Sequence, residues 1–253
     1  MPLFSIITAC FNAHEELMPT ERSLEQQVFR SFEWIVIDGG SVDGTVEFLN
    51  LNQNVTAWLS EPDEGIADAW NKGLSLCKGA QVLFLNAGDT YDKLMLETFS
   101  HHVSDKFITC CHARLGEDNS TSIFFAKPCL LWRGMHVPHN WCSVPMVKYK
   151  QLGGYEKLLY SMDFEWFARY YKVYGVSGFV VINKVLGQYG LGGYSDINYS
   201  ASFKENERIL VSLGMNSKKA KLLRFTYICK HFIRYRIVIL LSRKLKYVKN
   251  KIL

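Results

Sequence analysis

The chain has 253 residues, of which 48% are hydrophobic, 14% aromatic and 21% charged. This length allows a substantial buried core in one large or two small domains, and the composition excludes a disordered polymer, a collagen-like repeat and a disulfide-stapled miniprotein. The net charge of +5 is unevenly distributed: residues 208–253 carry 13 Lys and Arg and no Asp or Glu, whereas residues 1–207 carry −8. We expect the two regions to face different partners.

The sequence favours a cytoplasmic location. Residues 1–7 lack the basic region and the small-residue cleavage site of a signal peptide, and no segment approaches the roughly 18 uninterrupted apolar residues that a membrane span needs. The seven cysteines form no C-x-x-C pair, which favours reduced thiols.

The first half of the chain alternates strand-like and helix-like segments. Strands are predicted at residues 4–10, 34–37, 57–59 and 81–85, and helices after residue 44 and at residues 66–77. Strands that are apolar on both faces and separated by helices indicate a mainly parallel sheet with helices on both faces. Ligands bind beyond the carboxyl ends of such strands. The polar residues gather at these ends: Asn12 after the first strand, Asp38 after the second and Asp89 after the fourth.

The second half is less regular. Strands are predicted at residues 108–112 and 122–126, and helices at residues 147–152 and 163–174. An Asp just past a strand end, or at a helix start as at Asp163, has two interpretations that stay open. It holds a cation or a sugar hydroxyl in a cleft, or it caps the next helix.

Several motifs occur in a fixed order along the chain: SIITACFN (5–12), VIDGGSVDGT (36–45), SEPDEGIADAWNKG (60–73), LNAGD (85–89), PHNW (138–141), LGGY (152–155), MDFEW (162–166) and GGYS (192–195). In this order and spacing, the region from about residue 3 to 200 resembles the family 2 glycosyltransferases. The resemblance implies a Rossmann-like α/β fold of the GT-A type. It also implies an inverting enzyme that moves a sugar from a nucleotide-diphospho-sugar, with UDP as the expected nucleotide.

The resemblance assigns roles to particular residues. It places Phe11 and Asp38 in the nucleotide-base pocket with Asp63 and Asp68 nearby, and Asn86 and Gly88 beside the donor. Asp89 would be the ligand of Mn²⁺ or Mg²⁺, which suit oxygen ligands and substrate phosphates. Asp163 would be the catalytic base that deprotonates the acceptor hydroxyl.

Two further residues carry open alternatives. His139 either contacts the diphosphate or metal, or is a structural histidine. Trp166 is a candidate to stack on an acceptor sugar, although the aromatic residues Phe164 and Phe167 beside it are more typical of the core. The sequence also departs from the common family pattern at Gly39, which replaces a second Asp, and at Gly88, since LNAGD has one carboxylate where many relatives have more. We interpret both departures as altered ribose contacts or weaker metal dependence.

The last region, residues 208–253, is predicted to be a basic amphipathic helical tail that follows a glycosyltransferase domain over residues 1–207. That domain would comprise a nucleotide-sugar half (1–100) and an acceptor half (101–207). Basic and apolar residues alternate at helical spacing from Lys218 onward, which favours binding of residues 218–253 to an anionic membrane. No nucleic-acid-binding module accompanies the charge, and a helix packed on the acidic body is the alternative.

The sequence therefore predicts a peripheral enzyme on the inner face of the cell membrane that extends a glycan, expected to be lipid-linked, for a bacterial surface polysaccharide. Two alternatives remain: a catalytically inactive relative that binds nucleotide-sugar or acts as a scaffold, and a sugar nucleotidyltransferase. The second would need a glycine-rich basic loop after the first strand, and residues 9–14 provide none.

Overall fold

The computed structural model describes residues 1–116, 122–190 and 198–229. The strands are β1 (Phe4–Cys10), β2 (Phe32–Asp38), β3 (Ala57–Ser60), β4 (Gln81–Phe84), β5 (Thr90–Tyr91), β6 (Ile108–Leu115), β7 (Ile123–Phe124), β8 (Cys142–Pro145) and β9 (Phe179–Tyr189). The helices are α1 (His14–Glu25), α2 (Thr45–Leu51), α3 (Ile66–Leu76), α4 (Met95–Ser100), α5 (Met146–Leu152), α6 (Met162–Tyr174) and α8 (Tyr199–Ser212). Short 3₁₀ helices are η1 (Pro128–Arg133), η2 (His139–Trp141) and η3 (Val176–Gly178). Residues 217–229 are also helical.

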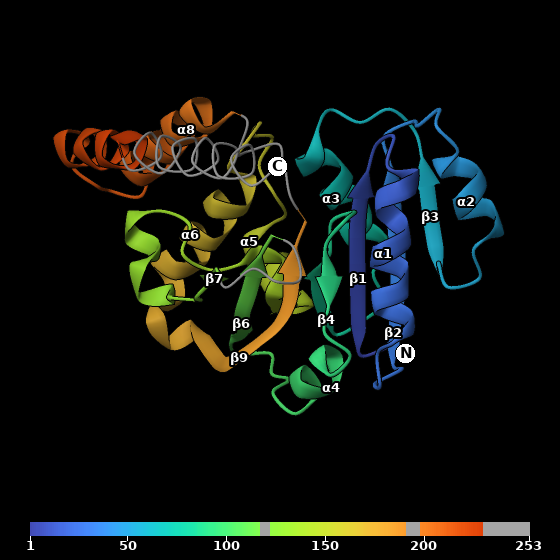
Figure 1. The fold of residues 1–253 in the computed structure, drawn as a ribbon. Helices are drawn as coiled ribbons and strands as arrows, with labels where there is room; N and C mark the ends of the chain where they lie inside the picture. The colour runs from blue at the N-terminus through green and yellow to red at the C-terminus, as the bar shows by residue number, and fades with distance from the viewer. Residues whose placement is uncertain (117–121, 191–197, 230–253) are drawn as a thin grey trace, which may run out of the picture.

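The strands form one mixed sheet in the order β3-β2-β1-β4-β8-β6-β9-β5, with β7 paired to β6. The strands β3, β2, β1 and β4 are mutually parallel, as the sequence predicts, whereas β8 runs antiparallel to both β4 and β6. Figure 1 shows β3 and α2 at one end of the molecule and α6 and α8 at the other. The α/β class is confirmed, and its second half is more antiparallel than predicted.

Alternate residues of the central strands pack into separate cores on the two faces of the sheet. On β1, Ile6 joins the core beneath α1, α2 and α4, and Ile7 joins the core beneath α3, α5 and α6. On β4, Leu83 and Phe84 divide in the same way. Successive side chains of a strand point to opposite faces, so a strand that is apolar at every position requires helices on both sides of the sheet.

The parallel register brings several strand ends to one edge of the sheet. Cys10 at the end of β1 pairs with Asp38 at the end of β2, and Asp38 pairs with Ser60 at the end of β3. The segments that follow these strands therefore lie side by side, and they carry Phe11, Gly39 and Asp63.

The predicted boundary at residue 207 falls inside a helix. Helix α8 continues to Ser212, and Ile209, Leu210 and Ala220 are buried in the core that α6 also lines. The division into two domains stays a prediction, although the polypeptide has no break in secondary structure at that point. Residues 230–253 of the predicted tail, and the motif at 192–195, lie outside the described residues.

Candidate active site

Asp38 lies at the end of β2 and is fully buried. Its Oδ2 accepts hydrogen bonds from the backbone N–H of Gly40 (3.1 Å), the N–H of Ser41 (2.9 Å) and the Ser60 hydroxyl (2.6 Å). Its Oδ1 accepts from the Ser41 hydroxyl. Burial would raise the pKa of this carboxyl, but the hydrogen bonds outweigh it and lower the pKa. Asp38 therefore stays ionised and holds the turn that follows β2.

Phe11 follows β1 and presents its ring to solvent, with 62% of its surface exposed. The next residue, Asn12, adopts a left-handed conformation (φ 47°), which Asn tolerates better than most residues. Two hydrogen bonds fix it: its N–H donates to the Ser41 hydroxyl (2.6 Å), and its side-chain oxygen accepts from the Val42 N–H (3.0 Å). These hydrogen bonds therefore hold the backbone next to the exposed aromatic ring.

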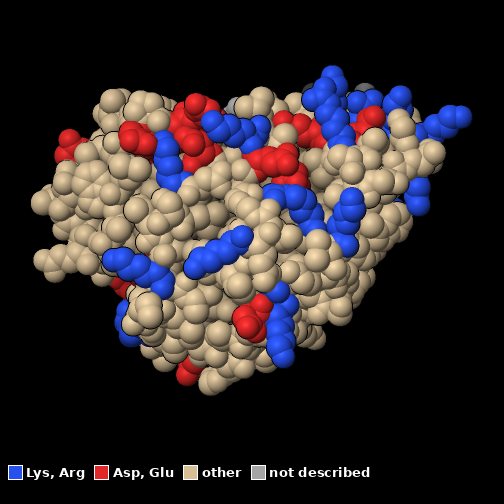
Figure 2. Space-filling model, turned by 180° about the vertical axis from the view of Figure 1, so that it is seen from behind, with Lys and Arg blue, Asp and Glu red and all other residues tan. Residues whose placement is uncertain are grey.

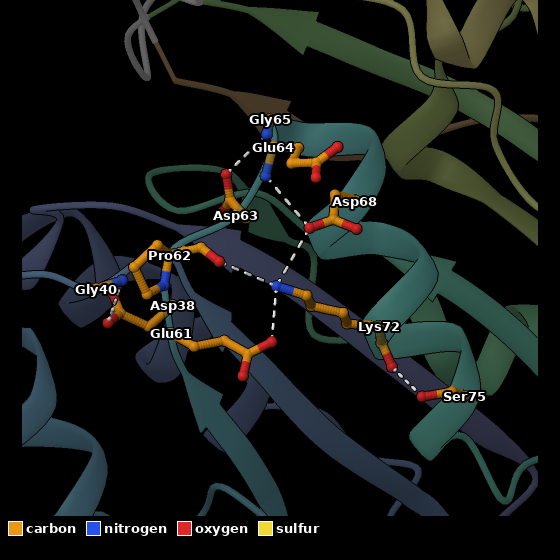
Figure 3. Close-up of polar contacts among 10 residues, drawn as sticks. All are labelled: Asp38, Gly40, Glu61, Pro62, Asp63, Glu64, Gly65, Asp68, Lys72 and Ser75. Atoms are coloured by element: carbon orange, nitrogen blue, oxygen red, sulfur yellow. Dashed lines mark hydrogen bonds and ion pairs between the residues drawn. The ribbon is translucent and has the colours of Figure 1, made fainter.

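The loop between β3 and α3 carries Asp63 and is held by Lys72 (Figure 3). The Lys72 Nζ lies 2.8 Å from Glu61 Oε1 and 3.2 Å from Asp68 Oδ2, and it donates to the Pro62 carbonyl (3.2 Å). Asp68 also accepts a hydrogen bond from the Glu64 N–H (3.2 Å). This hydrogen bond and the contact with Lys72 lower the pKa of Asp68. Asp68 and Lys72 therefore position the loop, whereas Asp63 lies closer to Phe11 and Gly39.

Asp89 follows β4 and is 5% exposed. Its Oδ1 accepts from the Gly190 N–H (2.7 Å), and its Oδ2 accepts from the Asn140 side-chain amide. Both donors are neutral, and burial raises the pKa of Asp89 to about 7. Asp89 has no cationic partner in the described part of the chain, and because an unpaired buried carboxylate is costly, this residue is suited to a cation.

The residues before Asp89 form a turn against α1. Gly88 has φ +88°, and its N–H donates to the Glu16 carbonyl (2.9 Å). The Thr20 hydroxyl donates to the carbonyls of Asn86 (3.4 Å) and Asp89 (3.0 Å). A side chain at position 88 would meet the left-handed strain that glycine avoids, which gives a conformational reason for the single carboxylate of this motif.

Asp163 lies in the first turn of α6 and is half-buried. Burial raises its pKa to about 6, although its Oδ1 accepts from the Phe164 N–H (2.7 Å). Burial also raises the pKa of the Tyr189 phenol, and Asp89 and Asp163 both add to that increase. The two carboxylates are therefore close enough to act electrostatically on one phenol, that of the last residue of β9 (Phe179–Tyr189).

Glu205 on α8 holds the segment that leads into α6. Its carboxylate accepts from the N–H groups of Leu159 (3.2 Å), Tyr160 (3.0 Å) and Ser161 (3.0 Å). Glu165, two residues after Asp163, forms an ion pair with Arg169 (2.6 Å) and takes no part in this arrangement. Glu205 therefore fixes the backbone immediately before Asp163.

His139 and Trp166 lie in the aromatic core. The His139 ring stacks on Phe84 (4.8 Å between ring centres), and its Nε2 is 2.9 Å from the Tyr155 hydroxyl. Burial lowers its pKa to about 3, so the ring is neutral. Trp166 is fully buried, and its indole N–H donates to the Gly153 carbonyl (2.9 Å). This packing supports the structural alternative for His139, and it places Trp166 in the core, where its ring is not exposed to an acceptor.

Sequence reasoning missed four residues of this site: Asn140, Tyr189, Gly190 and Glu205. Asn140 belongs to the PHNW motif, and this motif could have marked it as a site residue. Nothing in the local sequence indicates that its amide reaches Asp89, 51 residues away. Gly190 is 101 residues from Asp89, and Tyr189 ends a strand that the sequence did not predict.

The described residues do not form a complete metal site on their own. No group of three His, Cys, Asp or Glu side chains there could hold a metal by itself. A cation at Asp89 would need the substrate's phosphates and water as its other ligands.

A surface pocket of about 620 Å³ lies between α1 and α2, lined by Glu21, Phe48 and Asn52 among others, and contains none of the predicted site residues. No helix in residues 1–116, 122–190 and 198–229 is both long and apolar enough to cross a membrane.

Known proteins resemble this chain in sequence and in fold. It is 39% identical over 92 residues to an uncharacterised glycosyltransferase of Mycobacterium tuberculosis, covering 36% of this chain and 35% of the relative. It is 33% identical over 100 residues to TuaG of Bacillus subtilis, named for teichuronic acid biosynthesis, covering 38% of this chain and 40% of TuaG. The chain thus spans well under half of either relative.

Two solved structures share the fold. TarS of Staphylococcus aureus with UDP-GlcNAc matches with a TM-score of 0.64 at 15% identity, over 92% of this chain and 73% of that one. A mannosyltransferase of Pyrobaculum calidifontis with GDP-Man and Mn²⁺ matches with a TM-score of 0.60 at 13% identity, over 96% and 80%. These likenesses establish the GT-A type of fold. The model of the family named Glycosyl transferase family 2 matches residues 5–168, more than half of the chain, and the chain therefore belongs to this family.

Proposed function

We propose that the protein is an inverting glycosyltransferase that moves a sugar from a nucleotide-diphospho-sugar to a hydroxyl group of a glycan. The observation that carries this proposal is a pair of carboxylates, Asp89 and Asp163, whose pKa values burial raises to about 7 and about 6 and which both act on the pKa of the Tyr189 phenol. Strongly perturbed carboxylates in one site are typical of acid–base and metal chemistry. The UDP-GlcNAc bound to TarS supports UDP as the donor nucleotide.

Asp89 is the residue that would hold Mn²⁺ or Mg²⁺. Among the residues that the structure describes, its buried carboxylate has only neutral hydrogen-bond donors, and the Mn²⁺ in the Pyrobaculum mannosyltransferase supports this class of cofactor. When bound, the cation would stabilise the negative charge that gathers on the departing diphosphate. Asn140 and the Gly190 N–H orient the carboxylate for that task.

Asp163 would act as the base. With a pKa of about 6 it is ionised at neutral pH, yet it holds a proton more tightly than an ordinary Asp. It takes the proton of the acceptor hydroxyl, whose oxygen forms a bond to the anomeric carbon while the bond from that carbon to the diphosphate breaks. Attack on the face opposite the diphosphate inverts the anomeric configuration.

The donor nucleotide would lie along the edge formed by the ends of β1, β2 and β4. The exposed Phe11 ring provides a flat surface for the base, at the same strand-end edge as the turn after β2. Asp63 lies beside Phe11. Asp38 and Asp68 would not contact the base: Asp38 holds the turn after β2, and Asp68 holds the loop between β3 and α3. Asn86 and Gly88 form the turn that presents Asp89.

The acceptor would be a growing bacterial glycan, such as an O-antigen, capsule or exopolysaccharide, and a lipid-linked one is our preferred form. The name of TuaG, which assigns it to teichuronic acid biosynthesis, supports a surface polysaccharide. The helix at 217–229 supports a location at the inner face of the cell membrane. It carries exposed Lys218 and Lys221 together with exposed Leu222 and Phe225.

Trp132 on η1 extends this surface onto the body of the protein. It is 40% exposed, and the Lys219 ammonium lies 4.9 Å from the centre of its ring. Figure 2 shows Lys and Arg side chains gathered at the upper right, the end of the molecule where residues 217–229 lie. Basic residues near an anionic membrane contribute about 1 kcal/mol each, and exposed aromatic residues favour the interface.

A thermal-shift panel of nucleoside-diphosphate sugars, with and without Mn²⁺, tests the proposed donor class. We expect one UDP-sugar to raise the melting temperature by mass action and Mn²⁺ to increase that effect. Asp105→Asn, an exposed change, should keep it. An absence of stabilisation by every donor would contradict the proposal, and donor binding without hydrolysis or transfer in the presence of Mn²⁺ would favour the inactive relative.

A further inference from the structure

Tyr155, in the loop between α5 and α6, has a buried hydroxyl that no step of the proposed reaction uses. Its oxygen lies 2.9 Å from His139 Nε2 and 2.8 Å from the Tyr149 hydroxyl. His139 begins η2, and the next residue of this short helix, Asn140, donates its side-chain amide to Asp89. The Tyr155 hydroxyl is therefore connected to the proposed cation ligand through two residues of η2.

The backbone of Tyr155 is held by α3, which lies in the half of the chain proposed to bind the donor. The Asn71 side-chain oxygen accepts from the Tyr155 N–H (2.9 Å), and its amide donates to the Tyr155 carbonyl (2.8 Å). This pairing depends on Gly154, because a Cβ at that position would overlap the Asn71 side-chain oxygen. Figure 1 shows α3 beside β1, and α5 and α6 in the other half of the molecule. The loop thus connects the two halves.

Helix α6 holds the residues of the same loop that come before Tyr155. The two Nη atoms of Arg169 donate to the carbonyls of Leu152 (2.6 Å) and Gly154 (2.7 Å). The indole N–H of Trp166 donates to the carbonyl between them, that of Gly153. The loop is therefore fixed both to α3 and to the helix that carries the proposed base.

The chemistry of these groups sets the direction of each hydrogen bond between Asp89 and Tyr149. A carboxylate that binds a cation is ionised and only accepts hydrogen bonds, so Asn140 presents its NH₂ group to Asp89. Burial lowers the pKa of His139 to about 3, and a hydrogen bond to the Asn140 side chain acts in the opposite direction, as an acceptor does. The proton of the neutral ring therefore belongs on Nδ1. Its Nε2 then accepts from the Tyr155 hydroxyl, whose oxygen accepts from Tyr149.

We propose that Tyr155 is a positioning residue for the cation site: its hydroxyl holds His139, which keeps the NH₂ group of Asn140 turned toward Asp89. The inference rests on the proposed function, since it assumes a cation at Asp89. An Asn side chain turned the other way would direct its oxygen at the carboxylate, and two acceptors repel each other. The hydrogen bonds that lead from Tyr155 prevent that orientation. The Tyr91 hydroxyl, which donates to the Asn140 carbonyl (2.9 Å), fixes the backbone of the same residue.

The test measures the binding of Mn²⁺ to the 253-residue protein saturated with UDP. Free Mn²⁺ is followed by electron paramagnetic resonance, with UDP alone as the blank. One hydrogen bond corresponds to about fivefold in affinity, so we expect Tyr155→Phe to weaken Mn²⁺ binding by about that factor. Asn140→Ala, which removes the contact with Asp89 itself, should weaken it by about 10- to 100-fold. Isothermal titration of UDP without Mn²⁺ should give the same affinity for both variants and the unmodified protein.

Tyr149→Phe is the matched control. It removes a phenolic hydroxyl from the same buried core but leaves the hydrogen bond between Tyr155 and His139 in place, so the Mn²⁺ affinity should not change. Asn71→Ala acts on Tyr155 from another element. It releases the Tyr155 backbone and should weaken Mn²⁺ binding in the same direction as Tyr155→Phe. It takes the place of that variant in the test if Tyr155→Phe does not fold, which thermal unfolding without Mn²⁺ reports.

A double variant distinguishes positioning from a merely structural role. If Tyr155 acts through Asn140, adding Tyr155→Phe to Asn140→Ala should weaken Mn²⁺ binding no further, whereas independent effects add. Additive losses, an unchanged Mn²⁺ affinity of Tyr155→Phe, or an equal loss in Tyr149→Phe would overturn the role of Tyr155 while the cation site stands. If the unmodified protein binds UDP but no Mn²⁺, the cation site of the proposed function fails, and the role of Tyr155 fails with it.

Discussion

Replacing Asp163 with Asn should make the protein more stable at pH 8 while abolishing transfer. The pKa of Asp163 rises from its ordinary value of 3.8 to about 6 because the carboxyl is buried. Between these values the folded chain binds a proton that the unfolded chain has released, so stability falls as pH rises through this range. At 1.36 kcal/mol per unit, the ionised carboxylate costs about 3 kcal/mol above pH 6.

Asn removes the charge and keeps an oxygen that can accept from the Phe164 N–H. We therefore expect Asp163→Asn to gain up to about 3 kcal/mol in the free energy of unfolding at pH 8, and nothing at pH 3, where both states of the original protein are protonated. Urea denaturation at the two pH values measures the difference, and exposed Asp105→Asn should stay within about 0.5 kcal/mol. Equal or lower stability at pH 8, or a gain that persists at pH 3, would refute this reasoning.

The remaining predictions concern the cation, the segment before Asp163 and the membrane surface. Asp89→Ala should remove the extra thermal stabilisation that Mn²⁺ adds to UDP, and an unchanged Mn²⁺ effect would exclude Asp89 as a ligand. Glu205→Gln should lower kcat with little change in KM for the donor, because it loosens the N–H groups that precede Asp163; a change in KM alone would contradict this role. In the 253-residue protein, Lys218→Glu combined with Lys221→Glu should weaken binding to phosphatidylglycerol vesicles by about 30-fold or more, at about 1 kcal/mol per positive charge removed. Equal sedimentation with these vesicles would count against the membrane surface.

The first half of the fold could be predicted because its signals are local. The apolar strands end where polar residues begin, and a parallel sheet brings those ends together whatever the details of packing. The positions of Phe11, Asp38 and Asp89 at one edge follow from that rule. The register of β1, β2 and β3 bears this out for Phe11 and Asp38, and β4, which precedes Asp89, runs parallel to β1.

The second half was harder to predict because its strands lack a simple pattern. Strand β9 includes exposed Asn183 and Lys184, pairs with β6 through an irregular register, and alternates poorly between buried and exposed positions. Its end nevertheless supplies Tyr189 and Gly190 to the site. Its buried residues, Phe179, Ile182 and Leu186, do not fall at every second position, so the sequence lacks the alternation that identifies a half-buried strand.

The sequence could not distinguish carboxylates that hold a loop from carboxylates that could bind a ligand, because the difference lies in their three-dimensional contacts. Asp38 and Asp63 both follow predicted strands in the sequence, yet Asp38 accepts hydrogen bonds at both oxygens, whereas among the described residues Asp63 accepts at Oδ1 alone. The difference depends on which N–H and hydroxyl groups of neighbouring loops reach each carboxylate. His139, a candidate ligand by residue type, lies instead in a stack of aromatic rings.

The anomeric configuration of the first sugar released is the most direct test of the central claim, that Asp163 promotes inverting displacement of a nucleoside diphosphate. Slow hydrolysis of the preferred UDP-sugar with Mn²⁺ can be followed by proton NMR at early times, before the sugar equilibrates. The account predicts that the original protein first releases the sugar with the configuration opposite to that of the donor, and that Asp163→Asn binds the donor but releases none. A sugar that retains the donor configuration, or full hydrolysis by Asp163→Asn, would contradict it.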